Sequence, residues 1–290
     1  MLANPETRQT EHLVNIRSSI EELSNILPEI EFDEHTSKHS TYVGKLAYLI
    51  YKRLPQNIRN IIREEVANYF EIDPTYVEMI IEKLFDLIGN FHDIGKTHPE
   101  ISPLVMYKGK FNDEQRKLME EHTTSGAEAI IEITKVKPPE QLSLHELINP
   151  KITNKNAIAR LLALIAQTHH LVPGGYPFDI LVNPSTRISI NRIHNLIAVF
   201  TLADQLAALT EKREYQDFKI DDLDEVLEKI NSNTDKAKDK AKKLNGRSKR
   251  TIKNLRKRFK KILGNIENDG EFFNHLITLK EQIFGKHQEK

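Results

Sequence analysis

Seven histidine and aspartate residues of this chain have the chemistry of metal ligands and stand in or beside apolar stretches. Imidazole and carboxylate groups without thiolates suit iron, manganese, zinc, nickel or cobalt, and the chain has no cysteine. Taken singly, each residue is better explained as a buried side chain with a satisfied hydrogen bond, but the whole group favours one shared site. The seven are His39, His92, Asp93, His122, His169, His170 and Asp204.

Asp204 and the pair His92-Asp93 indicate how many metal ions the site would hold. Asp204 interrupts the apolar run LIAVFTLADQLAAL, where an ionised carboxylate is costly unless it is paired or bound to a cation. The adjacent His92-Asp93 offers one terminal ligand and one carboxylate that can bridge two ions. So many ligands fit a dinuclear site better than a mononuclear one. Lys96 follows one turn later on the same face.

Helices must position these residues, because apolar residues recur at helical spacing and the chain shows neither a convincing strand nor an internal repeat. The predicted fold class is therefore all-α. Gly95, just after the helix that ends at His92-Asp93, is expected to be a left-handed cap. Helices are predicted at 11–27, 34–54, 74–93, 113–133, 156–170, 191–212, 221–232 and 271–284, with a loop at roughly 136–155.

The composition is that of a helical protein without a membrane span. Of 290 residues, 39% are apolar and 29% charged, no apolar run reaches the 18 residues of a transmembrane helix, and the N-terminus does not resemble a signal peptide. A cytoplasmic protein is expected. Three segments are predicted: an N-terminal helix and linker at 1–33, a main helical domain at 34–217 and a C-terminal helical extension at 218–290. The N-terminal helix is expected to pack on the domain or to form a homodimer.

The charge is unevenly distributed, although the formal net charge is zero. Residues 236–261 hold fourteen Lys or Arg and a single acid, so this segment carries +13. We expect it to form a helix that docks within the chain or on a protein partner, with nucleic acid as the second alternative; basic runs also bind anionic membranes. Phe259 is the only aromatic residue there, so stacking on bases is not indicated.

The order of the ligand residues resembles that of a known family. His39, His92-Asp93 and Asp204, in this order on helices, are the pattern of the HD phosphohydrolase superfamily. The match is closer to its HD-GYP branch, and it covers about residues 34–217. The similar segments are FHDIGK (91–96), KGKFNDEQRKLMEEHTTSGAEAI (108–130), THH (168–170) with GGYP (174–177), and LADQLAALTEKREY (202–215).

The resemblance implies a fold, an activity and residue roles. The fold would be an HD-domain helical bundle. Known members of the branch are cyclic di-GMP phosphodiesterases, so a metal-dependent phosphodiesterase is implied, acting on cyclic di-GMP or a related signalling nucleotide through a metal-activated hydroxide. The seven residues would hold two divalent ions, with Fe or Mn favoured and Zn, Ni or Co as alternatives. Asp93 would bridge the ions, and Lys96 would be the catalytic cation at the substrate phosphate. Without the motif, Lys96 is better explained as a lysine that complements the helix dipole.

Several positions depart from the family pattern. His35 stands where members with three ions carry a glutamate, so it is either a ligand of a third ion or a surface histidine. Ala198 replaces a frequent arginine, and Arg187 and Arg192 lie nearby but out of register, as candidate substrate contacts. Tyr176 either contacts substrate or packs on the core. These departures concern substrate recognition, so they leave cyclic di-GMP in question but not the phosphodiester chemistry.

Two other functions fit parts of the sequence. A different HD-type nucleotide phosphohydrolase or a metal-dependent nuclease would give the basic segment a role in binding. A non-catalytic module that binds a nucleotide or a partner is less favoured, because degenerate members usually lose ligands and this chain keeps them.

Overall fold

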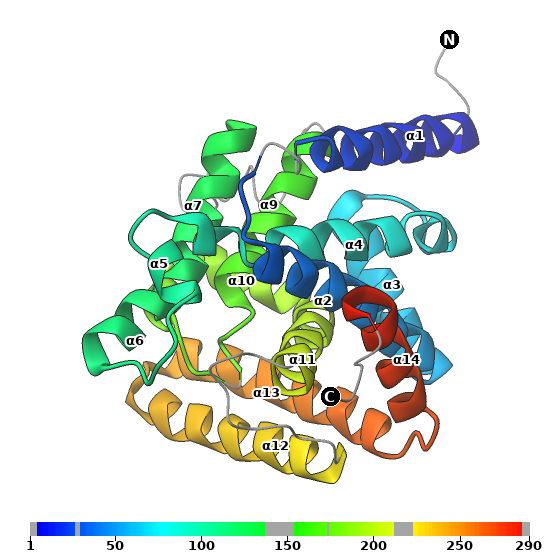
Figure 1. Cartoon of the computed structure of the whole chain (residues 1–290). Helices are drawn as coiled ribbons and strands as arrows, with labels where there is room; N and C mark the ends of the chain where they lie inside the picture. The colour runs from blue at the N-terminus through cyan, green and yellow to red at the C-terminus, as the bar shows by residue number, and fades with distance from the viewer. Residues whose placement is uncertain (1–4, 27–29, 137–153, 173, 212–222, 286–290) are drawn as a thin grey trace.

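Helices make up all the regular structure in the part of the chain described by this computed structural model, which covers residues 5–26, 30–136, 154–172, 174–211 and 223–285 (Figure 1). The all-α prediction is confirmed. The helices are α1 Pro5–Ser24, α2 Glu34–Arg53, α3 Gln56–Phe70, η2 Pro74–Met79, α4 Ile81–Phe91, η3 Ile94–Thr97, α5 Ser102–Val105, α6 Asp113–Glu120, α7 His122–Thr134, α9 Asn154–Thr168, η5 Asp179–Val182, α10 Pro184–Arg192, α11 His194–Thr210, α12 Leu223–Lys240, η6 Ala241–Lys243, α13 Gly246–Glu267 and α14 Phe272–Phe284.

Helix α11 forms the centre of the fold. Thirteen of its 17 residues are buried, and it packs against α2 and against α13. Helix α2 in turn crosses α4 at a contact between two glycines: a Cβ added to Gly89 would lie 2.3 Å from the Cα of Gly44. This close approach brings the last turn of α4 beside the middle of α2.

The terminal helices share this core. Helix α1 packs on α4 and α9, so its apolar stripe is covered within the chain. Helix α13 buries Ile252, Leu255, Phe259 and Ile262 against the rest of the protein, and α14 packs on α2. The predicted docking of both ends on the helical body is thus observed. The boundary proposed at 217/218 and most of the loop at 136–155 lie outside the described residues.

Three predicted helices are interrupted. The helix expected at 191–212 is broken at Ile193, which separates the end of α10 from the start of α11. The helix expected at 74–93 begins as the 3-10 turn η2, and α4 starts only after Ile80, whose φ of −122° is not helical. The helix expected at 113–133 is divided at Glu121 into α6 and α7. Helix α3, which the sequence patterns did not single out, fills residues 56–70. Among the described helices, none alone is long and apolar enough to cross a membrane. Helices α10 and α11 taken together reach the required length and apolar composition, but they are bent by 81° at the residue between them.

Gly95 is required for a different reason from the one expected. The described residues with positive φ include Gly175 and Gly285 but not Gly95, so it is not a left-handed cap. A Cβ at Gly95 would lie 1.9 Å from the carbonyl oxygen of His122 and 2.5 Å from the amide nitrogen of Gly126. The glycine therefore lets η3 lie directly against the first turns of α7, and this contact places His122 next to Asp93.

Candidate metal centre

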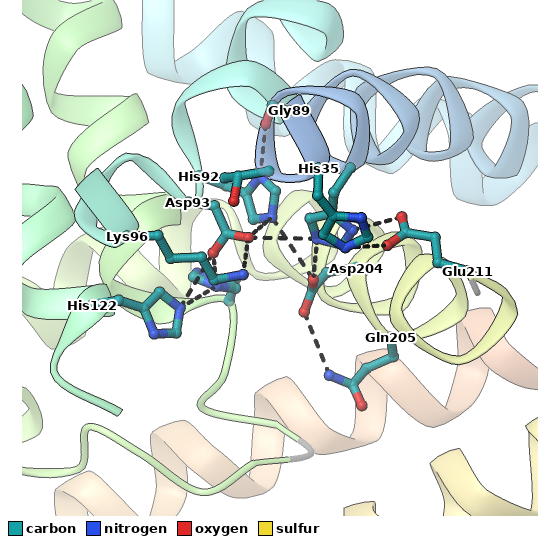
Figure 2. Close-up of polar contacts among 12 residues, drawn as sticks. His35, Gly89, His92, Asp93, Lys96, His122, Asp204, Gln205 and Glu211 are labelled. Atoms are coloured by element: carbon teal, nitrogen blue, oxygen red, sulfur yellow. Dashed lines mark hydrogen bonds and ion pairs between the residues drawn. The ribbon is translucent and has the colours of Figure 1, made fainter. Parts of the chain in front are cut away.

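The structure brings the seven predicted ligands together from five parts of the chain. His39 comes from α2, His92 and Asp93 from the end of α4, and Asp204 from α11; the other three come from the start of α7 and the end of α9. Figure 2 shows Asp93 and Asp204 near the middle of the cluster, with His122 on one side. Six of the seven are buried, and His170 keeps 16% of its side chain exposed.

Three of the histidines are fixed by the helix that each one ends or follows. The Nδ1 atom of His92 donates to the carbonyl of Gly89 at 2.6 Å, and that of His169 donates to Ala166 at 2.8 Å. His122, just after α6, makes the same bond to Met119 at 2.5 Å. The last carbonyls of a helix lack partners within it, so a histidine three residues on can use them. Each such bond fixes the tautomer, and the Nε2 lone pair is left for a metal ion.

His39 is fixed by a carboxylate instead of a carbonyl. Its Nδ1 lies 2.7 Å from Oε1 of Glu211, a residue 97% buried at the end of α11. Burial lowers the pKa of His39, but Glu211 and Asp204 outweigh that effect and raise it to about 9. Without a cation at Nε2, His39 is therefore protonated at neutral pH. A divalent ion would take the place of that proton.

The two carboxylate oxygens of Asp93 face two separate groups of ligands. Oδ2 lies 3.4 Å from Nε2 of His39 and 3.4 Å from Nε2 of His92. Oδ1 lies 3.3 Å from Nε2 of His122 and 3.8 Å from that of His169. This division is what a carboxylate shared by two ions requires.

The remaining two ligands complete the two groups. Asp204 lies in the first, with Oδ1 3.2 Å from Nε2 of His39 and 3.7 Å from that of His92. His170 lies in the second, where its ring, that of His122 and that of His169 bring nitrogen atoms within 4.8 Å of one another. Each group thus offers three or four donor atoms around one point.

The protonation states and the buried atoms of the cluster fit divalent ions. Nε2 of His92 and Oδ1 of Asp93 are buried and make no hydrogen bond to a described residue. Burial works to raise the pKa of Asp93, but Lys96, His92 and His122 hold it well below its usual value. Burial lowers the pKa of His170 to about 3, and burial together with the neighbouring imidazoles lowers that of His169. An ionised carboxylate beside neutral imidazoles is the donor set that ions of this type bind.

A cavity of about 190 Å³ opens beside the ligands. Lys96 contributes the one ammonium or guanidinium group among its described lining residues, and it pairs with Oδ2 of Asp93. Tyr176 also lines the cavity, where its ring stacks on that of His170 at a centroid distance of 4.9 Å. The apolar side chains that line the cavity are those of Leu104, Val105, Phe111, Met119 and Ala208.

Of the three other candidate residues, His35 lines the cavity and the two arginines do not. His35 lines the cavity, and its Nε2 lies 3.7 Å from Oε2 of Glu211, but it belongs to neither ligand group, so its role at a third ion stays a prediction. Arg187 donates to the carbonyls of Leu181 and Val182, the latter at 2.8 Å, and so caps η5. Neither Arg187 nor Arg192 lines the cavity, so the structure does not bring these two arginines to the ligands.

Glu211 is the residue of this centre that the sequence patterns missed. It stands seven residues after Asp204, two turns along α11, so helical spacing puts both carboxylates on one face. That spacing was a usable signal. What gives Glu211 its role is its contact with His39, which lies 172 residues away in the sequence.

Comparison of the chain with protein families, with curated proteins and with solved structures gave no match. The resemblance to the HD-GYP branch therefore rests on the residues and motifs of this chain alone.

Proposed function

We propose that this protein is a metal-dependent phosphohydrolase that cleaves a phosphodiester bond in a nucleotide. The observation that carries the proposal is Asp93, whose two oxygens face two groups of oriented donors, with Lys96 at the edge of the cavity. Two divalent ions held by such groups supply an activated water and stabilise the charge that develops on a phosphate during in-line displacement.

The side chains around the ions have separate roles in this proposal. Asp93 and Asp204 would balance the charge of the ions, while the Nδ1 contacts hold the imidazoles in a single orientation. Lys96 donates to Asp93 and borders the cavity, so its ammonium group can also contact a phosphate oxygen and stabilise charge there. Tyr176 keeps the His170 ring in place by stacking and closes one side of the cavity.

The size of the cavity bears on the substrate. Pockets that enclose a whole drug-sized ligand measure about 300–1,000 Å³. At about 190 Å³, this cavity has room for a phosphate and an adjoining group, and the rest of a cyclic dinucleotide would lie outside it. Cyclic di-GMP or a related signalling nucleotide remains the first candidate substrate. A strand of nucleic acid is the second, favoured by the exposed basic face of α13.

The test is a nucleotide panel assayed with metal content measured on the same sample. Protein prepared without oxygen and loaded with Mn or Fe should bind about two ions per chain and hydrolyse at least one cyclic dinucleotide, linear dinucleotide or oligonucleotide. Asp93→Ala should lose both the ions and the activity. Lys96→Gln should keep the ions but lower kcat by roughly a hundredfold or more, as for removal of one stabilising donor.

Two results would contradict the proposal. Metal-loaded protein that cleaves no phosphodiester in the panel would exclude a phosphodiesterase. Fewer than one bound ion per chain would favour a non-catalytic module that binds a nucleotide or a partner.

A further inference from the structure

The second half of the basic segment forms a helix with two opposite faces. Helix α13 turns one face to the protein core, with Ile252, Leu255 and Phe259 buried. At 3.6 residues per turn, Arg250, Lys253, Lys257 and Lys261 lie together on the opposite side. All four are exposed. The apolar face is already covered, so docking within the chain explains that face but leaves the charged one unexplained.

Exposed Lys residues are also found on the neighbouring elements α12 and η6. Figure 1 shows α12 and α13 side by side beneath α11, joined by the short turn η6. The described residues of 236–261 include eleven exposed Lys or Arg and one exposed acid, Asp239, which pairs with Lys242 at 2.7 Å. Oδ1 of Asp235 forms ion pairs with the guanidinium group of Arg256 at 2.8 Å and with Nζ of Lys260 at 3.3 Å. None of the four aligned residues of α13 pairs with a described acid.

We propose that the exposed Lys and Arg residues of α12, η6 and α13, here called the basic face, bind the phosphate backbone of nucleic acid. A stripe of exposed cations on one side of a helix is the footprint expected for phosphate contacts. No aromatic side chain is exposed on the basic face in the described part of α12 and α13, so bases would not be stacked and binding would be independent of sequence.

An anionic membrane is the less suitable partner. A helix that lies in a membrane interface inserts an apolar face, but here that face is packed against α11. The large apolar side chains exposed among the described residues, such as Met106 and Val182, lie on other elements.

The basic face also adjoins the wall of the metal-site cavity. Nζ of Lys240, at the end of α12, lies 3.2 Å from the carbonyl of Gly174, two residues before Tyr176. A Cβ at Gly175 would lie 2.9 Å from Cδ of Lys240, so the loop rests directly on this helix. A bound strand would therefore lie near the cavity. The inference that the bound strand is also the substrate rests on the proposed function. The inference that the basic face binds nucleic acid does not depend on it.

Binding can be tested with the metal removed, which separates it from hydrolysis. The full chain in chelator would be titrated against fluorescein-labelled single-stranded RNA and DNA of about 20 nucleotides, longer than one usual binding footprint, between about 50 and 200 mM salt. The variant Arg250→Gln, Lys253→Gln, Lys257→Gln removes three cations of the basic face. The matched control is Lys52→Gln, Lys83→Gln, Lys135→Gln, which neutralises exposed lysines on α2, α4 and the end of α7.

The unmodified chain should bind at low salt, and its affinity should fall steeply as salt is raised. The basic-face variant should bind roughly 10- to 100-fold more weakly. The slope of log affinity against log salt concentration should be smaller by about two, as expected for three lost contacts to a single strand. The control should bind like the unmodified chain. Equal binding by the two variants would overturn the proposal, as would no binding at about 50 mM salt. Binding to phosphatidylserine vesicles without binding to either oligonucleotide would also overturn it, in favour of a membrane surface.

Discussion

Hydrogen bonds at Nδ1 decide which atoms the histidines of this centre present. His92, His122 and His169 each donate to a backbone carbonyl three residues earlier, whereas His39 uses the carboxylate of Glu211. A carbonyl is neutral, but a carboxylate adds negative charge behind the imidazole and makes Nε2 a stronger donor to a metal. The group of ligands that includes His39 should therefore depend on Glu211.

Glu211→Ala is expected to weaken metal binding by about 10- to 100-fold, the usual cost of losing an oriented carboxylate behind a ligand histidine. The weaker ion should be the one held by His39, His92 and Asp204. Competition with a metal-binding dye would measure both affinities.

The variant Glu211→Gln separates orientation from charge. Its amide oxygen can still accept from Nδ1 of His39, so it should recover part of the affinity lost in Glu211→Ala. If both variants bind two ions as tightly as the unmodified chain, Glu211 does not position His39. Thermal unfolding of the metal-free variants would show whether any loss comes from a general loss of stability.

The residue types and their order along the chain were sufficient to predict that these seven side chains converge. Residue-level prediction failed for groups whose role depends on distant partners. Glu211 acquires its role only when the end of α11 lies beside α2. Arg187 stands near Ala198, where the family that the chain resembles often has an arginine. Its guanidinium group caps η5 instead, and its place in the sequence could not show this.

At the scale of helices, the sequence predicted the elements better than their breaks. The prediction for 34–54 matches α2, where Asp33 caps the first turn by accepting from the amide of Thr36 at 2.9 Å. The interruptions at Ile80 and Glu121 were missed because the apolar spacing continues through both. The break at Glu121 stands directly before His122, whose Nδ1 donates to the carbonyl of Met119 in the last turn of α6.

Gly95→Ala should destabilise the protein by about 1–3 kcal/mol or more, because the new methyl group would meet the backbone of α7 and not a movable side chain. The shift of α7 should also lower occupancy of the ion bound by His122. Chemical denaturation and metal analysis would measure the two effects.

The same substitution at Gly264 is the matched control. This glycine lies within α13, and an added Cβ would find its nearest neighbour, a carboxylate oxygen of Glu267, at 4.0 Å. Gly264→Ala should stabilise the protein by about 0.5–1 kcal/mol through helix propensity. Similar destabilisation by both substitutions would rule out the steric explanation for Gly95.

Helix α11 is capped by a side chain from another helix. Glu65 of α3 is buried and accepts from the amides of Asn195 and Leu196 at 3.1 and 3.0 Å. Glu65→Ala should leave these amides unsatisfied and cost about 2–3 kcal/mol. Glu64→Ala, an exposed neighbour on the same helix, should change the free energy of unfolding by no more than about 0.5 kcal/mol. Comparable losses for the two variants in urea denaturation would show that Glu65 does not cap α11.

For the whole molecule, removal of metal should produce a characteristic pH dependence of stability. The folded pKa of His39 is raised to about 9, so its contribution is present below the unfolded value of about 6.5 and is lost as pH rises through about 9. The pKa of His170 is lowered to about 3 and that of His169 is also lowered, so below about 6.5 the unfolded chain binds more protons and stability falls as pH falls. Metal-free protein should therefore be most stable near pH 6.5 and lose stability on both sides.

Bound metal should remove the loss of stability that the metal-free protein shows at alkaline pH. A ligand histidine is already deprotonated at the coordinating nitrogen, so the loss toward pH 9 should disappear in Mn-loaded protein, while acid should still weaken it by releasing the ions. Melting temperatures from about pH 5 to 9.5, with chelator and with Mn, would measure this, and His39→Gln should abolish the alkaline loss in chelator. A flat profile between pH 6.5 and 9 in metal-free protein would contradict the assignment to His39 and Glu211.

The bonds from His92, His122 and His169 to helix-end carbonyls also have a kinetic consequence. Terminal turns open locally far more often than a protein unfolds as a whole. Opening the last turn of α4 or α9 would let one imidazole swing away while the rest of the fold stays intact. An ion in this centre would then exchange at a rate set by the fraying of single helix ends. Its binding should in turn slow amide hydrogen exchange at those helix ends, although they are far apart in the sequence.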